Sequence, residues 1–432
     1  MTEPHKTFAF SQRARRAKVQ PISFLMAQGV ENPDVISLAA GLVDYDTLPA
    51  AQAAKLVGEI LADPTAARTA LQYGTTEGYE TLREALLEHV AGLDGWRPDD
   101  MNLTADNVVV AAGSQQLLFI LSDVLVDPGD IVITSWPSYF VYTGTLEALG
   151  ADVRCVDMDA DGMVGESLDA LLEALADSGD LRRVKIVYIV SYHQNPTGIT
   201  LSEPRRRQIA EIVRKYSRGH RILLLEDAAY RELTFTGDAP GSMKRFDPRN
   251  EYVAVLQTFS KPFAPGLKTG YGLLPGDLVE PVILQKGNHD FGSANFCQHL
   301  LARAMARGVY ARHVADLCRA YAAKRDAMLA ALDEHLGAMA GATWTRPSGG
   351  LYVFLTLPEH LETGAGGALF TRAVEEGVLY VPGEYCYGPD PTRTAPRNTI
   401  RLSYGVCPVE KIPLAVAALA RAIEAVARGD SP

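Results

Sequence analysis

The sequence predicts an α/β protein with a large domain built on a mostly parallel sheet flanked by helices, and a smaller α+β domain formed from both chain ends. The chain has 432 residues, more than one hydrophobic core usually serves. Short apolar runs alternate with helix-like segments through the middle of the chain, which is typical of parallel strands covered on both faces. The chain after this region is rich in alanine, leucine and charged residues in helical patterns.

The elements follow in order along the chain. The apolar runs predict strands over 108–113, 131–137, 184–192, 221–230 and 252–260. A helix is expected over 203–217, one long helix over 300–335 and an amphipathic C-terminal helix over 410–429. We therefore expect a large domain over 48–295, with the smaller domain formed by 1–47 and 296–432.

The composition and charge of the chain argue against several classes of function. Lys and Arg number 41 and Asp and Glu 52, so the formal net charge is −11 and nucleic acid is not an expected partner. No apolar stretch is long enough to span a bilayer, and the first residues lack the apolar core of a secretory signal. The five cysteines are scattered without close pairs, which argues against a disulfide framework or a metal site. A cytoplasmic protein without a membrane partner is expected.

Polar residues follow the predicted strands where each one ends. Ser114 and Gln115 come after the first run, Tyr139 after the second and Asn195 after the third. Asp227 ends the fourth, and Ser260 with Lys261 follows the fifth. Because ligands bind at the carboxyl ends of the strands in open α/β sheets, we expect these side chains to surround one site.

The residue types at that edge suit a pyridine-ring cofactor that carries an aldehyde and a phosphate. Lys261 is an amine that can form a Schiff base, and the nearby cation Lys268 can bind phosphate and lower the pKa of that amine. Asp227 can pair with a protonated ring nitrogen, and the helix start after Gly113 favours an anion. The sequence therefore predicts a site for pyridoxal 5′-phosphate (PLP).

Further side chains can complete this site. Tyr230 and Asn195 can bind a ring hydroxyl, and Tyr139 can stack on the ring. Arg401, in the strand-like segment 398–403, can hold a carboxylate through two parallel hydrogen bonds. A surface arginine on a strand is an equal alternative for Arg401.

Three segments carry a resemblance to a known family. SYHQNPTG at 191–198, EDAAY at 226–230 and TFSKPFAPGLKTGY at 258–271 occur in the order and spacing of the class I/II aminotransferases of PLP fold type I. The resemblance runs from about Leu38 to the final helix and is nearest to the α-aminoadipate, kynurenine and aromatic subgroup. It implies a seven-stranded sheet in the large domain and an enzyme that moves an amino group between an amino acid and a 2-oxo acid.

The resemblance also implies a role for each matching residue. Lys261 would be the Schiff-base lysine and proton shuttle, and Asp227 would bind the pyridine nitrogen. Tyr73 would reach the phosphate of a neighbouring subunit in a homodimer, and Gly41 would approach the substrate carboxylate beside Arg401. The remaining cofactor contacts would come from Ser114, Gln115, Tyr139, Asn195, Tyr230, Ser260 and Lys268.

The sequence departs from the family pattern in places. Lys268 stands where the family usually has Arg, so the charge is kept and the two-pronged geometry is lost. Lys18 is the nearest match to an N-terminal arginine that helps define the substrate pocket in the subgroup. The segment 287–296, GNHDFGSANF, has no assigned role.

Other functions share this set of residues. Cβ–S lyases and cyclopropane-forming synthases keep the lysine, the aspartate and the tyrosine, and differ in groups around the substrate. A transcription regulator with an aminotransferase-like domain would need an added helical DNA-binding domain and clustered basic charge, neither of which the sequence indicates. Transamination is the leading hypothesis.

Overall fold

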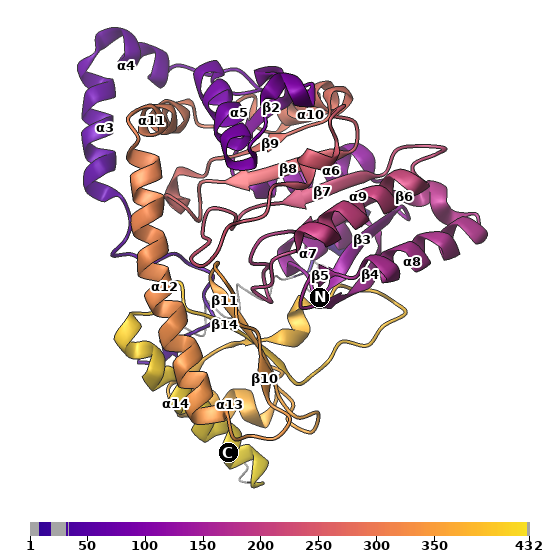
Figure 1. Cartoon of the computed structure of the whole chain (residues 1–432), viewed down its shortest axis with the longest axis vertical. Coiled ribbons are helices and arrows are strands. Elements are labelled where there is room, and N and C mark those ends of the chain that lie inside the picture. Colours follow the sequence, from indigo (N-terminus) through magenta and orange to yellow (C-terminus); the bar gives the residue numbers. More distant parts are fainter. Residues whose placement is uncertain (1–7, 19–31, 33, 430–432) are drawn as a thin grey trace, which may run out of the picture.

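A computed structural model of the chain describes residues 8–18, 32 and 34–429 (Figure 1). Within these residues the largest sheet has eight strands in the order β2-β9-β8-β7-β6-β3-β4-β5. Neighbouring strands are parallel except at β9, which is antiparallel to β2 and β8, and at β5, which forms a hairpin with β4. The strands are β2 (Val108–Ala111), β3 (Ile131–Trp136), β4 (Asp152–Asp159), β5 (Gly162–Met163), β6 (Val184–Val190), β7 (Leu223–Asp227), β8 (Val253–Thr258) and β9 (Gly270–Leu273).

The mostly parallel sheet is as predicted, and it has seven strands besides the two-residue β5. The five apolar runs of the sequence form β2, β3, β6, β7 and β8. Two strands were not predicted: β4, which carries charged residues among its apolar ones, and β9, which is a short strand with two glycines. Both strands gain their stability from the neighbours they pair with rather than from an apolar run of their own.

Helices cover both faces of this sheet (Figure 1). Val108 and Val110 of β2 belong to the larger core cluster on one face, whereas Val109 and Ala111 face the opposite cluster, as the two-residue period of a strand requires. The first face is covered by α5 (Glu80–Asp94), α8 (Gly165–Asp177), α9 (Glu203–Tyr216) and α11 (Asn295–Ala306). The second is covered by α6 (Ser114–Leu125), α7 (Phe140–Leu149) and α10 (Gly276–Asp290).

A smaller unit combines the two ends of the chain. Its antiparallel sheet has the order β10 (Thr343–Trp344), β11 (Tyr352–Thr356), β14 (Thr399–Ser403) and β13 (Val381–Pro382). The early strand β1 (Ile36–Ser37) pairs with the late strand β12 (Val378–Leu379), and Leu38 and Ala39 share a core with α13 (Ala368–Glu375) and α14 (Ile412–Ala427). The division of the chain at 47/48 and 295/296 stays a prediction.

The single long helix expected over 300–335 is wrong. The region forms α11 and then α12 (Val309–Leu336), separated by Gly308. Gly308 has a φ of 64°, in the left-handed region that glycine adopts easily and a continuing helix does not allow. Figure 1 shows α12 running from the large sheet unit to the smaller one, so this helix joins the two cores.

Helix α9 begins and ends at residues that typically mark helix ends. Ser202 precedes α9, Pro204 lies in its first turn, and Arg214 and Lys215 lie in its last turn, where cations favour the helix dipole. Further helices of the described residues are α1 (Gln12–Arg16), α3 (Ala50–Ala62) and α4 (Pro64–Leu71). Among the helices of the described residues, none combines the length and apolar character that crossing a membrane requires.

Candidate active site

The polar residues at the strand ends surround one cavity of about 300 Å³, which we call the strand-end pocket. Its walls come from the residues that follow β2, β3, β6, β7 and β8, at the carboxyl edge of the sheet. Nine residues selected from the sequence line it: Ser114, Gln115, Tyr139, Asn195, Asp227, Tyr230, Ser260, Lys261 and Lys268. The sheet topology thus brings together groups that are up to 154 residues apart, from Ser114 to Lys268.

Asp227 is a buried carboxylate without an ion-pair partner among the described residues. Tyr188 donates a hydrogen bond to its Oδ2 at 2.9 Å, and the backbone N–H of Ala229 donates to its Oδ1 at 3.2 Å. Burial raises the pKa of Asp227 to about 6, because these two neutral donors offset only part of the cost of a buried charge. A cation that enters the pocket beside Asp227 would lower this pKa again.

Lys261 is half-buried and contacts the N-terminal part of the chain at Gly41. Its Nζ donates a hydrogen bond to the carbonyl oxygen of Gly41 at 2.9 Å. A side chain at position 41 would meet the hydroxyl of Tyr352, since a Cβ there would lie 2.8 Å from that oxygen. A larger residue at position 41 would therefore require the Tyr352 side chain to shift.

Tyr230 is held by a second tyrosine. Its hydroxyl lies 3.2 Å from the hydroxyl of Tyr352, and the two rings meet edge to face. Burial and the neighbouring Tyr352 raise the pKa of Tyr230 well above its ordinary value, so the phenol is protonated and can donate a hydrogen bond. The pair presents one hydroxyl to the pocket with a fixed direction.

Arg401 is buried, with 1% of its surface exposed, so the alternative of a surface arginine is wrong. Its Nη1 donates to Oδ1 of Asn195 at 3.0 Å and its Nη2 to the carbonyl of Ala39 at 2.8 Å. Its guanidinium carbon lies 4.6 Å from the ring centre of Tyr352. Within the described residues Nε has no hydrogen-bond partner and no carboxylate pairs with the group. A buried cation with only neutral acceptors favours an anionic ligand.

The start of α6 forms the opposite corner of the pocket. Gly113, with a φ of 80°, precedes the first turn of the helix, which leaves its N–H groups directed outward. Gly270 packs against this turn so closely that a Cβ there would lie 2.5 Å from the backbone nitrogen of Ser114. Lys268 and Ser260 line the same cavity. Together these groups offer N–H donors, hydroxyl donors and a cation to a phosphate.

The residues of this pocket fit PLP. An unpaired carboxylate, a nucleophilic amine and an anion-binding helix start occupy different walls of one cavity, as a ring with a nitrogen, an aldehyde and a phosphate requires. Arg401 and its free Nε lie beside the cavity, where a carboxylate of a substrate would be needed.

Four of the predicted residues are not among those that line the strand-end pocket: Gly41 and Arg401 contact lining residues, whereas Lys18 and Tyr73 lie elsewhere. Lys18 is exposed and forms an ion pair with Glu147 of α7 at 2.6 Å, so its charge is directed to the surface of the large unit. Tyr73 is 83% exposed, and its ring contacts that of Phe291. In the single chain neither side chain lines the pocket.

Sequence reasoning missed two tyrosines that support the site. Tyr188 lies in β6 and reads as one more apolar strand residue, and Tyr352 lies beyond the family segments, in SGGLYVFL at 348–355. Each reaches the site only because its strand lies beside another: β6 pairs with β7, and β11 pairs with β14 at the register of Tyr352 with Ser403. A tyrosine within an otherwise aliphatic buried strand is the signal that points to Tyr188.

The comparisons with known proteins identify the family of the chain. Residues 33–419 match the family model described as "Aminotransferase class I and II". The chain belongs to this family. It is therefore a PLP-dependent aminotransferase that moves an amino group between an amino acid and a 2-oxo acid, and the fold is PLP fold type I.

Several of its relatives are named for the activities of the subgroup that the sequence resembles. The aminotransferase is 32% identical over 417 residues to aromatic-amino-acid aminotransferase 1 of Thermococcus litoralis, covering 96% of this chain and 94% of that one. Kynurenine aminotransferase of Pyrococcus horikoshii has a TM-score of 0.87 and 31% identity, with 96% of each chain covered. The α-aminoadipate aminotransferase LysN of Thermus thermophilus, solved with N-(5′-phosphopyridoxyl)-L-leucine, has a TM-score of 0.82 and 29% identity, covering 97% of this chain and 98% of that one.

Proposed function

We propose that the strand-end pocket is the active site and that its residues take the roles expected from the sequence. When bound, PLP supplies the aldehyde that condenses with amino groups and the ring that draws electrons from Cα. Lys261 would hold the cofactor and carry the proton between Cα and C4′. Asp227 would keep the ring nitrogen protonated, Tyr230 and Asn195 would bind the ring hydroxyl, and Tyr139 would lie against the ring. The phosphate would be held by Ser114, Gln115, Ser260 and Lys268.

We further propose that Arg401 binds the substrate α-carboxylate, next to the carbonyl of Gly41. The observation that carries this assignment is a buried guanidinium whose partners in the described chain are all neutral. Asn195 and Ala39 hold it in place, so one edge of the group stays available. A fixed carboxylate orients the substrate about its Cα–N bond, which places the bond to be broken perpendicular to the ring.

Arg401→Leu should lower kcat/KM for amino-acid donors by roughly a hundredfold, since a charge-assisted pair is worth about 3 kcal/mol. PLP occupancy, measured by absorbance, should be unchanged. The matched control is Arg346→Leu, which removes a surface pair with Asp333 and should change kcat/KM less than about threefold. A near-wild-type Arg401→Leu enzyme would reject the carboxylate assignment.

The same pocket supports a preference for donors with an uncharged side chain. The described lining of the pocket contains two cationic residues, Lys261 and Lys268. Lys268 would already be paired with the cofactor phosphate. Lys18 is paired with Glu147, and residues 19–31 contain no Lys or Arg. A side-chain carboxylate would therefore lack a free cationic partner among the described lining of the pocket. Relatives named for aromatic amino acids and for kynurenine favour the proposal, whereas the relatives named for 2-aminoadipate favour an acidic donor.

A panel of donors followed by half-reaction absorbance tests this preference. Phenylalanine and leucine should give kcat/KM at least about tenfold above aspartate and 2-aminoadipate, because an unpaired buried carboxylate is costly. Equal or higher values for the two acidic donors would contradict the proposal and indicate a cation from elsewhere.

We also propose that the active unit is a homodimer in which Tyr73 serves the neighbouring site. Tyr73, Leu71 and Phe291 are 83%, 69% and 63% exposed in the single chain, and the rings of Tyr73 and Phe291 are in contact, so large apolar side chains gather here at the surface. Tyr73 lines a second cavity of about 680 Å³, which lies outside the strand-end pocket. A second copy of the chain is the occupant that the family resemblance favours.

Hybrid dimers test the role of Tyr73. We expect Lys261→Ala and Tyr73→Ala homodimers to be strongly impaired. In the hybrid of the two variants, one site would combine an intact Lys261 with an intact Tyr73 from the partner and should regain about half of the wild-type rate. If Tyr73 acts within its own subunit, the hybrid should stay as impaired as the Tyr73→Ala homodimer.

We infer a cytoplasmic location from the five cysteines, all of which are free thiols in the structure. Fractionation of cells that express the protein, alongside marker proteins of the cytoplasm and of the secreted fraction, tests this inference. Recovery in a secreted fraction would contradict it.

A further inference from the structure

The segment 287–296, for which the sequence predicts no role, contacts the start of α6 through Asp290. The Nζ of Lys286 is fully buried and pairs with Oδ1 of Asp290 at 2.9 Å. Oδ2 of Asp290 accepts two further hydrogen bonds, from Nε2 of Gln116 at 3.0 Å and from the hydroxyl of Ser293 at 2.9 Å. Burial favours the neutral form, but these donors together hold the pKa of Asp290 below its ordinary value. Asp290 is therefore a charged acceptor at neutral pH.

Gln116 connects Asp290 to a segment that lines the strand-end pocket. While its Nε2 donates to Asp290, its Oε1 accepts a hydrogen bond from the backbone N–H of Ala112 at 2.8 Å. Ala112 and the next residues, Gly113, Ser114 and Gln115, line the pocket; we call 112–115 the phosphate turn. Because Asp290 can only accept, it fixes which end of the Gln116 amide faces the phosphate turn.

Asp290 is itself held in place by its surroundings. The hydroxyl of Thr76 donates to the carbonyl of Phe291 at 2.6 Å, and Nε2 of Gln298 donates to the carbonyl of Ser293 at 3.0 Å. These contacts fix the chain on the C-terminal side of Asp290, while Lys286 fixes it from α10. Such a rigid support is what a binding loop needs in order to keep its donors aligned before the ligand arrives.

We propose that Asp290, with Lys286 behind it, is a positioning residue that orients the phosphate turn through Gln116 for the cofactor phosphate. The proposal rests on the proposed function of the pocket. Lys286 makes a carboxylate acceptable near an anion site, because the ion pair cancels its charge. A purely structural Asp290 would stabilise the segment without affecting how the phosphate is bound.

The experiment measures binding of PLP and of pyridoxal, which lacks the phosphate, to the full-length apo protein by absorbance titration. Gln116→Glu directs a carboxylate at Asp290 and should weaken PLP binding about tenfold or more, whereas Asp290→Asn should weaken it about threefold. The double variant Q116E/D290N reverses donor and acceptor with the net charge unchanged, and should return PLP affinity to within about threefold of wild type. Pyridoxal binding should change less than about twofold throughout.

The matched control is Gln208→Glu. Nε2 of Gln208 donates to Glu166 at 2.7 Å on the surface, so this variant also directs one carboxylate at another, far from the pocket. It should leave both affinities unchanged. Gln116→Met, which loses both hydrogen bonds without adding charge, gives a second test if Gln116→Glu fails to fold by near-ultraviolet circular dichroism.

Two results would overturn the proposal. One is PLP binding within about twofold of wild type in Gln116→Met and Asp290→Asn, and the other is an equal loss of PLP and pyridoxal affinity in every variant. A double variant no better than Gln116→Glu would likewise reject the reversed pairing. Failure of the wild-type protein to bind PLP would instead reject the proposed function.

Discussion

Glu226 and Asp227 are consecutive residues of β7, and they show how one strand serves two different purposes. Their side chains point to opposite faces of the sheet, as the strand period requires. Both are buried, at 0% and 4% exposed, and burial raises the pKa of both carboxyls. The two residues differ in their partners: Glu226 has a cation beside it, and Asp227 has none among the described residues.

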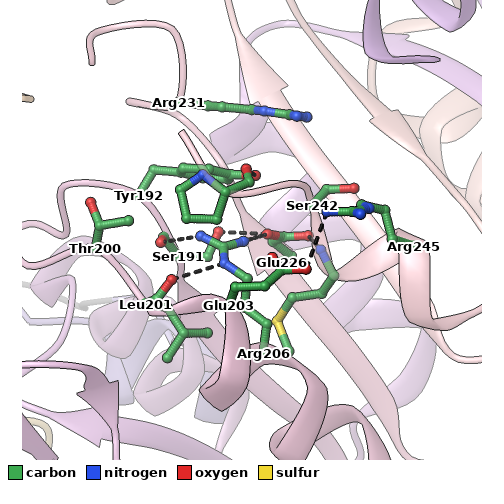
Figure 2. A network of polar contacts seen from close by, with 12 residues as sticks. Ser191, Tyr192, Thr200, Leu201, Glu203, Arg206, Glu226, Arg231, Ser242 and Arg245 are labelled. Carbon is green, nitrogen blue, oxygen red and sulfur yellow. Dashed lines mark hydrogen bonds and ion pairs between the residues drawn. The ribbon is translucent and has the colours of Figure 1, made fainter. Parts of the chain in front are cut away.

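Glu226 lies in a closed polar network. Figure 2 shows the guanidinium of Arg206 directed at it, and the two groups pair at 2.8 Å. The hydroxyl of Ser191 and the backbone N–H of Met243 donate the remaining hydrogen bonds to Glu226, at 2.6 and 2.7 Å. Arg206 also donates to the carbonyls of Ser191 and Leu201, which flank the loop that carries Asn195. Every charge in this network has its partner within the chain.

A second pair closes the network on its far side. The ring of Tyr192 lies between the guanidinium groups of Arg206 and Arg231, at 4.2 and 5.3 Å from the ring centre (Figure 2). Arg231 pairs with the buried Asp94, which also accepts from Ser242. The comparison shows that a buried carboxylate with all its partners supports the fold, whereas one that lacks a cation marks a place for a ligand.

The largest effect on activity should come from Asp227→Asn. The variant keeps the shape but loses the charge that holds the ring nitrogen protonated, so proton abstraction should slow by roughly a thousandfold or more. Stopped-flow half-reactions with the best donor measure this. Half-reaction rates within tenfold of wild type would show that Asp227 and Glu226 do not differ in the way proposed.

Glu226→Gln should instead act on stability. It leaves Arg206 as a buried charge without its carboxylate, so the free energy of unfolding should fall by about 3–5 kcal/mol, measured by urea denaturation. The control Glu203→Gln removes the exposed pair with Arg245 and should cost less than about 1 kcal/mol. Equal effects of the two variants would contradict the distinction between a closed buried network and a surface pair.

The pH dependence of the apo protein sharpens the comparison. Because the pKa of Asp227 rises from 3.8 to about 6 on folding, the stability associated with its protonated form is present below pH 4 and is lost as pH rises through 6. Asp227→Asn removes this loss. The variant should therefore gain stability relative to wild type between pH 4 and 7, by up to about 3 kcal/mol in denaturation at each pH. A constant difference across this range would contradict the raised pKa.

The smallest effect should come from Tyr188→Phe. It removes one neutral hydrogen bond to Asp227 and leaves the one from Ala229, so kcat/KM should fall less than about tenfold. The pKa of Asp227 in the apo protein should rise further. The loss of folding stability that accompanies ionisation of Asp227 should therefore occur at a higher pH than in the wild type. An unchanged pH profile would show that Tyr188 does not support the charged carboxylate.

The sequence by itself predicted the sheet, the cofactor and the order of residues around the pocket. Apolar runs that end in Asp227 or Lys261 place those residues at the carboxyl edge of a parallel sheet whatever the details of packing. The same reasoning was wrong about the helix over 300–335, because the conformation that Gly308 adopts is decided by the packing of α11 and α12 on different cores.

Only the tertiary structure decided which charges are paired. Glu226 and Asp227 are equivalent in a sequence, and their partners Arg206 and Tyr188 come from other elements. Arg401 was an even choice between surface and site until its burial among Asn195, Ala39 and Tyr352 was known. The energy of a charge depends on its solvent exposure and on atoms within a few ångströms, and those distances exist only after the chain has folded.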